Sequence, residues 1–331
     1  MLEKFKEIIE KLQSDLCFRK KVYITLALLA SIILIIPANI YWAHDRYYYV
    51  HLYARISDDM LLRRLEEGIL QTLSNEPLFL LFNTFLANFL STTAVVRFII
   101  FSASFISLIA FGKLAKYNLW MIFFFFFFPN IILKYTAQIR QGLAIGVYAF
   151  GLTAFLNKEK WGAIRYLSIF IHTSLAFNFV IEWLERIFEK LKLRLKSRIS
   201  ISFLLFLLIP VAIPIALYIL GDRRLEQYNF YGLYSGASGL GFVMWFGIGI
   251  VYLFFAKKKF IFNFCIYGIL MYLTFYFTLD IGSRIFENVI PIFIASILAD
   301  KRRDFRKFFI ILFCLVGTLI WLTGAWGNIA A

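Results

Sequence analysis

Charged residues are scarce in this sequence. Asp, Glu, Lys and Arg make up 17% of its 331 residues, whereas hydrophobic residues make up 61% and aromatic residues 20%. A soluble domain cannot hide so much apolar surface, which excludes the soluble classes of enzyme and binding protein. Nearly every residue falls in an apolar run of membrane-spanning length or in a short connection. The sequence therefore predicts an all-α polytopic membrane protein, with residues 1–331 forming a single integral membrane domain.

Cysteine and histidine are rarer still. The three cysteines, Cys17, Cys265 and Cys314, show neither the spacing of metal ligands nor an evident disulfide partner. His44 and His51 could share a helical face, but no third ligand accompanies them. The sequence therefore predicts no metal site and no cofactor.

The common catalytic motifs are missing as well. The chain has no H-E-x-x-H, Walker A, G-x-S-x-G or dinucleotide-binding pattern. It also lacks any Asp-x-Asp triplet, which favours arginines over a metal ion for stabilising a diphosphate leaving group. Any transfer reaction of this chain that releases a diphosphate is accordingly predicted to be metal-independent.

Positive charge predominates over negative charge, with a formal net charge of +15. The basic residues cluster in short segments between apolar runs, as orientation signals do, so we expect membrane lipid and not nucleic acid as a partner. Those within residues 1–21 place the N-terminus in the cytoplasm, where Phe5, Ile8 and Leu12 mark one face of an amphipathic segment. Residues 221–239 then form an outer loop.

The first outer loop is expected over residues 42–76. Apolar residues recur at helical spacing between Met60 and Leu73, which predicts one or two helices resting on the outer membrane surface. A further helix is predicted to start near Glu76, because Ser74 or Asn75 can cap it and Pro77 suits a first helical turn. Glu76 would then lie at a helix N-terminus, where a carboxylate can simply complement the helix dipole.

The chain is predicted to cross the membrane about eleven times, but residues 77–180 allow two topologies. In the first, Leu78–Leu90 crosses, which places Lys113 outside and Arg140 in the cytoplasm, against the charge rule. In the second, Leu78–Leu90 dips in and returns, so that Lys113 is cytoplasmic while Arg140 and His172 face outward. We favour the second topology. It requires residues 161 to about 188 to form a broken hairpin that turns near His172.

Arg140 lies between two strongly apolar runs. A guanidinium at bilayer depth costs roughly 2.5–3.5 kcal/mol on insertion scales, so such residues usually face a cavity or an anion. The alternative is an interfacial arginine that reaches to lipid phosphate. The favoured topology gathers charged and titratable residues at the outer side, namely Asp45, Glu76, Arg140, His172, Arg223, Arg224 and Arg284.

This gathering suits a lipid-linked diphosphate. Guanidinium groups bind phosphate oxygens bidentately, and a carboxylate or histidine beside them could take a proton from a sugar hydroxyl. His172 stands in an otherwise apolar stretch and could equally be a packed core residue. Tyr228, in the outer loop, could stack on a sugar face or belong to an aromatic belt.

Four short motifs follow one another in the chain: Asn75-Glu76-Pro77-Leu78-Phe79, Ile139-Arg140-Gln141-Gly142-Leu143-Ala144, Phe170-Ile171-His172-Thr173-Ser174 and Ser283-Arg284-Ile285-Phe286. Their order resembles that of the EpsG family of Wzy-type polysaccharide polymerases, over roughly residues 20–300 of this chain. Leu78 stands where that family favours glycine, and Thr173 where a lysine is frequent.

The resemblance implies a multi-pass enzyme of the bacterial inner membrane with a plan similar to that of GT-C glycosyltransferases. Such an enzyme uses polyprenyl-diphosphate-linked oligosaccharides as donor and acceptor on the periplasmic or external face, and its expected partners are a chain-length regulator and a flippase. The resemblance makes Glu76 and His172 candidates for activating the acceptor hydroxyl, and Arg140 and Arg284 candidates for binding the diphosphate. The remaining candidates are Asp45 for catalysis and Gln141, Arg223, Arg224 and Tyr228 for substrate binding.

Other functions fit a membrane protein with outward arginines. A lipid-linked glycan ligase or a membrane acyltransferase would use a similar one-sided site. A flippase or exporter of lipid-linked glycans would place charges along a pathway through both leaflets and would show internal repeats. The charges here gather at one face, which favours the polymerase.

Overall fold

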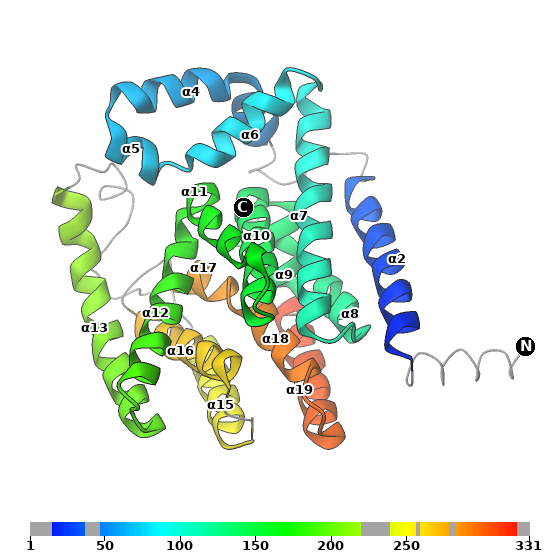
Figure 1. Ribbon diagram of the computed structural model, residues 1–331, viewed down its shortest axis with the longest axis vertical. Coiled ribbons are helices and arrows are strands. Elements are labelled where there is room, and N and C mark those ends of the chain that lie inside the picture. The colour runs from blue at the N-terminus through cyan, green and yellow to red at the C-terminus, as the bar shows by residue number, and fades with distance from the viewer. Residues whose placement is uncertain (1–14, 37–46, 220–238, 256–258, 278–281, 323–331) are drawn as a thin grey trace, which may run out of the picture. The chain divides into compact units, whose positions relative to one another are not determined.

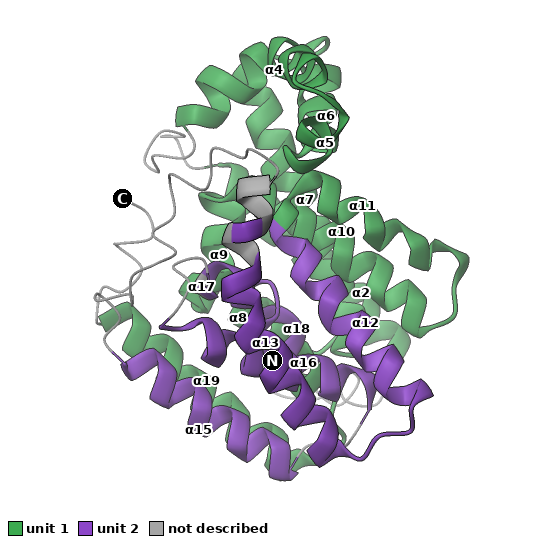
Figure 2. Ribbon diagram, turned by 90° about the vertical axis from the view of Figure 1, so that its left-hand side faces the viewer, with its two compact units in different colours: residues 1–173, 294–331 green, residues 174–293 purple. Residues whose placement is uncertain are grey.

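The computed structural model describes residues 15–36, 47–219, 239–255, 259–277 and 282–322, and all regular structure in these ranges is helical (Figure 1). The chain forms two compact units, coloured separately in Figure 2. Unit 1 comprises residues 1–173 and 294–331, and unit 2 comprises residues 174–293. The prediction of a single integral membrane domain stays a prediction.

Short and long helices alternate in unit 1. They are α2 (Leu16–Ile35), the π-helix η1 (Tyr49–Tyr53), α4 (Ala54–Glu66), α5 (Ile69–Ser74), α6 (Pro77–Ala87), α7 (Thr92–Leu114), α8 (Trp120–Phe127), α9 (Pro129–Thr136), α10 (Ile139–Leu156), the 3-10 helix η2 (Lys160–Tyr166), α11 (Leu167–Ile171) and α19 (Arg303–Leu322). Helices are thus present where the spacing between Met60 and Leu73 predicts them, as α4 and α5.

The helices α7 and α10 form the centre of unit 1 and lie parallel to each other. Gly146 of α10 packs so closely on α7 that a Cβ there would meet Ser107 Oγ at 2.6 Å. Near the C-terminal ends of both helices, Lys113 Nζ lies 2.6 Å from Glu159 Oε1, and this pairing lowers the pKa of Glu159. The two helices therefore begin at one end of the unit, with Arg140, and finish at the other, with Lys113.

Both topologies place Lys113 and Arg140 on opposite sides of the membrane, so the choice between them stays a prediction. Lys113 and Glu159 share one end of the α7–α10 pair, whereas Arg140 lies at the opposite end. The helix α6 has 11 residues and spans only about 16 Å, half of the roughly 30 Å hydrocarbon core. Such a helix is too short to cross a bilayer by itself, as the second topology requires of Leu78–Leu90.

Among the residues that the structure describes, four helices are long and apolar enough to span a membrane: Thr92–Leu114, Ile139–Leu156, Leu195–Ala212 within a longer helix, and Arg303–Leu322. Shorter apolar helices are Pro77–Ala87, Leu240–Phe255 and Phe260–Phe275. The chain is accordingly a membrane-embedded helical protein. The predicted count of about eleven crossings is not confirmed, because much of the apolar sequence folds into short or interrupted helices.

Unit 2 is built around α16 (Phe260–Phe275), which packs against α12, α13, α15 and α17. These helices have the bounds Ala176–Lys190, Leu195–Ile219, Leu240–Phe255 and Gly282–Glu287; α18 (Ile290–Leu298) continues from unit 2 into unit 1, and the 3-10 turn η3 (Thr173–Leu175) precedes α12.

A buried carboxylate joins three helices of unit 2. Glu185 of α12 accepts hydrogen bonds from Asn263 Nδ2 at 2.5 Å and Tyr267 Oη at 3.1 Å, both on α16. Arg198 of α13 donates to the same carboxylate at 3.0 Å. Because a buried carboxylate is costly unless it is paired and hydrogen-bonded, this cluster fixes the mutual packing of α12, α13 and α16.

Candidate functional site

Glu76 lies at the joint between α5 and α6. Its backbone adopts the left-handed conformation, with φ 61° and ψ 49°, which is uncommon for a residue other than glycine and costs roughly 1–3 kcal/mol. The side chain is buried and 8% of the residue's surface is exposed. Pro77 begins α6 directly after it and supplies the fixed φ of a first helical turn.

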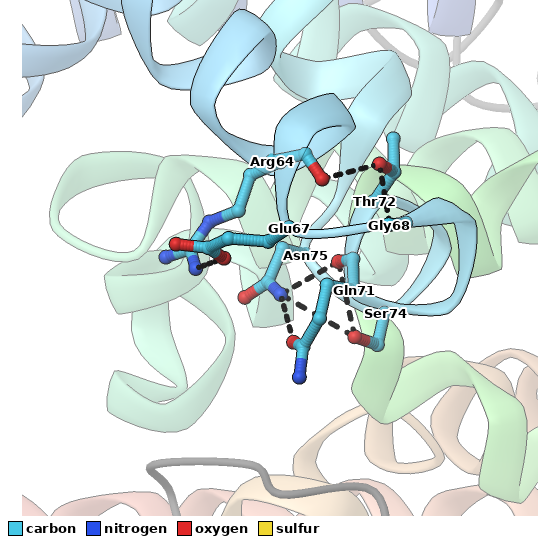
Figure 3. A network of polar contacts seen from close by, with 7 residues as sticks. All are labelled: Arg64, Glu67, Gly68, Gln71, Thr72, Ser74 and Asn75. Atoms are coloured by element: carbon cyan, nitrogen blue, oxygen red, sulfur yellow. Dashed lines mark hydrogen bonds and ion pairs between the residues drawn. The ribbon is translucent and has the colours of Figure 1, made fainter.

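The prediction that Ser74 or Asn75 caps α6 is wrong. Asn75 Nδ2 instead donates to the Gln71 carbonyl oxygen at 2.7 Å, and Ser74 Oγ donates to the same oxygen at 3.2 Å (Figure 3). Both side chains therefore close the C-terminus of α5 and not the N-terminus of α6. The reason is the left-handed turn at Glu76, which separates the two helices and directs Asn75 back along α5.

The corner between α4 and α5 is held by a second group of contacts in Figure 3. Thr72 Oγ1 lies within hydrogen-bonding distance of the carbonyl oxygens of Arg64, at 2.8 Å, and Gly68, at 3.0 Å. Arg64 also pairs with Glu67 at 2.6 Å. The loop from α4 to Glu76 is thus a hydrogen-bonded structure that ends at the buried carboxylate.

Arg140, near the start of α10, binds Glu76 directly. Its Nη1 lies 2.6 Å from Glu76 Oε2, and its Nε donates to Tyr49 Oη at 3.2 Å. The guanidinium carbon lies 4.7 Å from the ring centre of Tyr53, with the rings of Tyr49 and Phe79 at 5.7 and 5.9 Å. An aromatic cage of this kind stabilises a partly desolvated cation. The Nη2 atom has no partner among the described residues.

His172 completes the group from a third direction. The helix α11 stops at this residue, whose backbone is extended, and a 3-10 turn follows from Thr173. The helical run is therefore interrupted near His172, as the broken hairpin requires. His172 Nδ1 donates a hydrogen bond to Glu76 Oε1, while Nε2 has no partner in the described part of the chain. The side chain retains 24% of its surface exposed.

The arrangement matches that of a histidine general base oriented by a carboxylate. A neutral imidazole that donates Nδ1–H to Glu76 presents the lone pair of Nε2 to an incoming hydroxyl. The carboxylate would then stabilise the imidazolium that forms when the proton arrives. Arg140, bound to the other carboxylate oxygen, provides fixed positive charge in the same place.

A pocket opens beside Arg140. Its volume is about 160 Å³, and its lining consists of Tyr48, Tyr49, Leu52, Tyr53, Met60 and Arg140. The first four of these residues come from η1 and the residue before it, and Met60 comes from α4. Aromatic rings and one guanidinium therefore form most of its wall.

Gln141 lies next to Arg140 but is only 2% exposed. Its Oε1 accepts a hydrogen bond from Lys134 Nζ at 3.0 Å, and Gln138 Oε1 accepts another from the same ammonium group. Lys134 is itself 1% exposed, on α9. A direct contact of Gln141 with substrate stays a prediction, since its amide now has a clear role in satisfying a buried lysine.

The part that the other predicted site residues play in this group stays a prediction. Arg284 lies exposed on α17 of unit 2, so its place beside Arg140 stays a prediction. Asp45, Arg223, Arg224 and Tyr228 lie outside the described residues. Within the described part of the chain, no group of three or more His, Cys, Asp or Glu side chains could hold a metal ion.

Sequence reasoning missed Lys134 and the aromatic cage. A lysine inside the apolar run Ile131–Tyr135 was a usable signal, because a cation there needs a partner. The cage residues Tyr49, Tyr53 and Phe79 gave no comparable signal, since aromatic residues make up 20% of the chain.

Comparison with known proteins gives one family. A model of the EpsG family matches residues 22–329, nearly the whole chain. No curated protein and no solved structure matches this chain.

Proposed function

Because the chain belongs to the EpsG family, a family of Wzy-type polymerases, we propose that it polymerises lipid-linked oligosaccharide units at the outer face of the bacterial inner membrane. The growing glycan on one polyprenyl diphosphate is the donor. A hydroxyl on a second polyprenyl-diphosphate-linked repeat unit is the acceptor. The protein acts with its N-terminus in the cytoplasm and without a metal ion.

The proposed chemistry assigns one step to each member of the group. His172 Nε2 takes the proton of the acceptor hydroxyl as its oxygen attacks the anomeric carbon of the donor's lipid-proximal sugar. The bond between that carbon and the diphosphate oxygen breaks, and polyprenyl diphosphate leaves with the bonding electrons. Glu76 holds the imidazole in position, and Arg140 stabilises the charge that develops on the leaving diphosphate.

The observation that supports this proposal is the meeting of three separate motifs at one carboxylate. Glu76 pairs with Arg140 and with His172, although these residues lie 64 and 96 positions away in the sequence. A purely structural role for the three would not require a His172 Nε2 that has no partner among the described residues, beside an arginine with a partly exposed side chain. Arg284, Arg223, Arg224, Gln141, Tyr228 and Asp45 remain proposed contributors around this centre.

The decisive experiment resolves reaction products by size. Purified protein in detergent receives the host's lipid-diphosphate-linked repeat unit in the presence of EDTA, alongside the variants Arg140→Ala and His172→Ala. We expect a ladder of products from the wild type and a loss of roughly 100-fold or more in rate from each variant. Arg97→Ala, an exposed arginine on α7, is the matched control and should give the wild-type ladder.

Each alternative function predicts a different outcome. A ligase would give a single transfer product, and a flippase would give no product although it moves the lipid across a vesicle membrane. A wild-type ladder that neither variant reduces, with both variants eluting as folded protein, would reject the proposed site. A ladder abolished by EDTA would reject the metal-independent mechanism.

A further inference from the structure

The roles proposed for His172 and Glu76 leave the pocket beside Arg140 without a function. It is built on η1, a single turn of π-helix, and such turns occur frequently at functional sites. Residues four positions apart on this turn, Tyr49 and Tyr53, place their ring centres 5.4 Å from each other. Tyr48, the residue before the turn, is 42% exposed and supplies an aromatic face to the pocket wall.

The size of the pocket limits what it can hold. Its volume of about 160 Å³ is well below the range of roughly 300–1,000 Å³ that is usual for drug-sized ligands. A single six-membered ring with its hydroxyl groups is an occupant of suitable size, whereas a whole oligosaccharide repeat is not. The tyrosine lining offers both apolar ring faces and hydroxyl groups, which suits a ligand that is apolar on its C–H face and polar at its edge.

Arg140, in the pocket wall, indicates which chemical group would lie next to a ring bound in the pocket. Arg140 uses Nη1 for Glu76 and Nε for Tyr49, and Nη2 is left without a partner among the residues described. A free guanidinium nitrogen at the edge of a pocket is a donor for a phosphate oxygen. A ring inside the pocket and a phosphate at Arg140 would therefore be neighbours in one ligand.

Resting on the proposed function, we propose that this pocket binds one pyranose ring of the lipid-linked glycan, the sugar bonded directly to the diphosphate. Tyr48 stacks on the ring, and Arg140 contacts the adjoining phosphate. The pocket thereby selects the donor sugar and places its anomeric carbon beside the Glu76–His172 pair.

Equilibrium binding with two probes tests this inference without turnover. The first probe is the host's lipid-linked repeat unit, and the second is polyprenyl diphosphate without sugar. We expect Tyr48→Ala to weaken binding of the first probe by about tenfold and to leave the second unchanged, because only the first carries a ring to stack. Tyr48→Trp, which retains an aromatic face, should restore binding of the first probe. Arg140→Ala should weaken both probes.

The binding experiment has its own control variant, and the results that would contradict it differ from those of the polymerase assay. Phe89→Ala removes another exposed aromatic ring, 72% exposed and outside the pocket lining, and should change neither affinity. Equal weakening of both probes by Tyr48→Ala, or weakening of neither, would overturn the sugar pocket while leaving the polymerase intact. A protein that binds the first probe selectively but forms no ladder would overturn the proposed function and not the pocket.

Discussion

Glu76 serves two partners at once, one on each carboxylate oxygen. Arg140 occupies Oε2 at 2.6 Å, and His172 Nδ1 donates to Oε1. A carboxylate with both oxygens engaged is poorly placed to take a proton itself. His172, whose Nε2 has no partner within the described residues, is therefore the base that we propose.

We predict that Glu76 and His172 act as one catalytic unit. Glu76→Gln and His172→Ala should each lower kcat by roughly 100- to 10,000-fold, because the first misorients the imidazole and the second removes it. The double variant should be no slower than the slower single variant, since residues of one unit lose their contribution together. Initial rates of ladder formation for the three variants measure this coupling.

Glu67→Gln is the matched control for this pair of substitutions. Glu67 is a carboxylate of the same loop, bound to Arg64 at the surface, where an ion pair is worth little. Its variant should retain the wild-type kcat. Multiplicative losses in the double variant, far below either single variant, would contradict a shared unit.

Glu76, Arg140 and His172 could be selected as candidates from the sequence, but the aromatic side chains around Arg140 could not. Arg140 and His172 stand out because polar groups are expensive within apolar runs. Tyr53 and Phe79, which surround Arg140, look like any other aromatic residue of a membrane protein. The roles that we propose for Glu76 and His172 depend on which carboxylate oxygen meets which partner, and no sequence pattern carries that information.

At the scale of helices, the turn between α5 and α6 sets the position of the carboxylate. Asn75 closes α5 through its bond to the Gln71 carbonyl, and Glu76 takes up its left-handed conformation at the next residue. The residue that closes α5, Asn75, therefore directly precedes the residue that contacts Arg140 and His172.

We predict that Asn75→Asp lowers kcat by roughly tenfold with little change in KM for the lipid-linked unit. The aspartate has nearly the same size but replaces the Nδ2 donor with an oxygen that repels the Gln71 carbonyl, so Glu76 moves and alignment for catalysis suffers. Steady-state kinetics of the folded variant separate kcat from KM. Ser74→Ala loses the 3.2 Å bond to the Gln71 carbonyl and the 3.3 Å bond from Asn75 Nδ2, but it keeps the 2.7 Å bond of Asn75, so it should stay within about twofold of the wild type. An equal loss in both variants would contradict the assignment.

Close packing of α9 on α10 gives a stability prediction. A Cβ added at Gly142 would collide with the Lys134 carbonyl oxygen, so Gly142→Ala should destabilise the protein by about 1–3 kcal/mol. A lower apparent midpoint of thermal unfolding in detergent would record this loss. Gly247→Ala is the control: nothing lies within 4 Å of its added Cβ, and alanine is favoured over glycine in a helix by about 1 kcal/mol. Its midpoint should be unchanged or higher.

Helix starts and short helices were predictable where turn chemistry and periodicity agree. Pro77 marks the start of α6, and the spacing from Met60 to Leu73 predicts α4 and α5. The sequence predicted Asn75 as a cap of α6, whereas it closes α5, because an Asn between two helices can bond to the helix before it as well as to the one after it. The π-turn at Tyr49–Tyr53 left no signal, since its wider hydrogen bonding is decided by packing and not by composition.

In unit 1 as a whole, the group of Glu76, Arg140 and His172 lies at one end, and the Lys113–Glu159 ion pair lies at the other. The parallel helices α7 and α10 carry Arg140 at one end and the Lys113–Glu159 pair at the other. The charge rule predicts that the basic end is cytoplasmic, which would place Glu76 and His172 outside.

Cysteine labelling tests this orientation in intact cells. In a variant whose three native cysteines are replaced by serine, Glu67→Cys should react with a membrane-impermeant maleimide added outside. Lys158→Cys, an exposed position near the basic end, should react only after the membrane is permeabilised. Labelling of both positions without permeabilisation would favour the first topology, in which Lys158 lies outside and Arg140 is cytoplasmic.

The overall architecture was predictable only in outline. Composition alone identifies a helical membrane protein, because 61% hydrophobic residues leave no other class. The number of crossings was not predictable from apolar runs, since runs such as Trp120–Thr136 are broken by Pro129 into the short helices α8 and α9. Periodicity reports which segments are apolar but not where a helix bends.

The single guanidinium shared between Glu76 and the pocket has a consequence for the order of events. A diphosphate that draws Arg140 toward itself would leave the Glu76 carboxylate to stabilise the His172 imidazolium alone. Proton removal from the acceptor would then become favourable only after the donor has arrived. Such an enzyme would bind its two substrates in a compulsory order, and water reaching the empty site would meet a base that is not yet active.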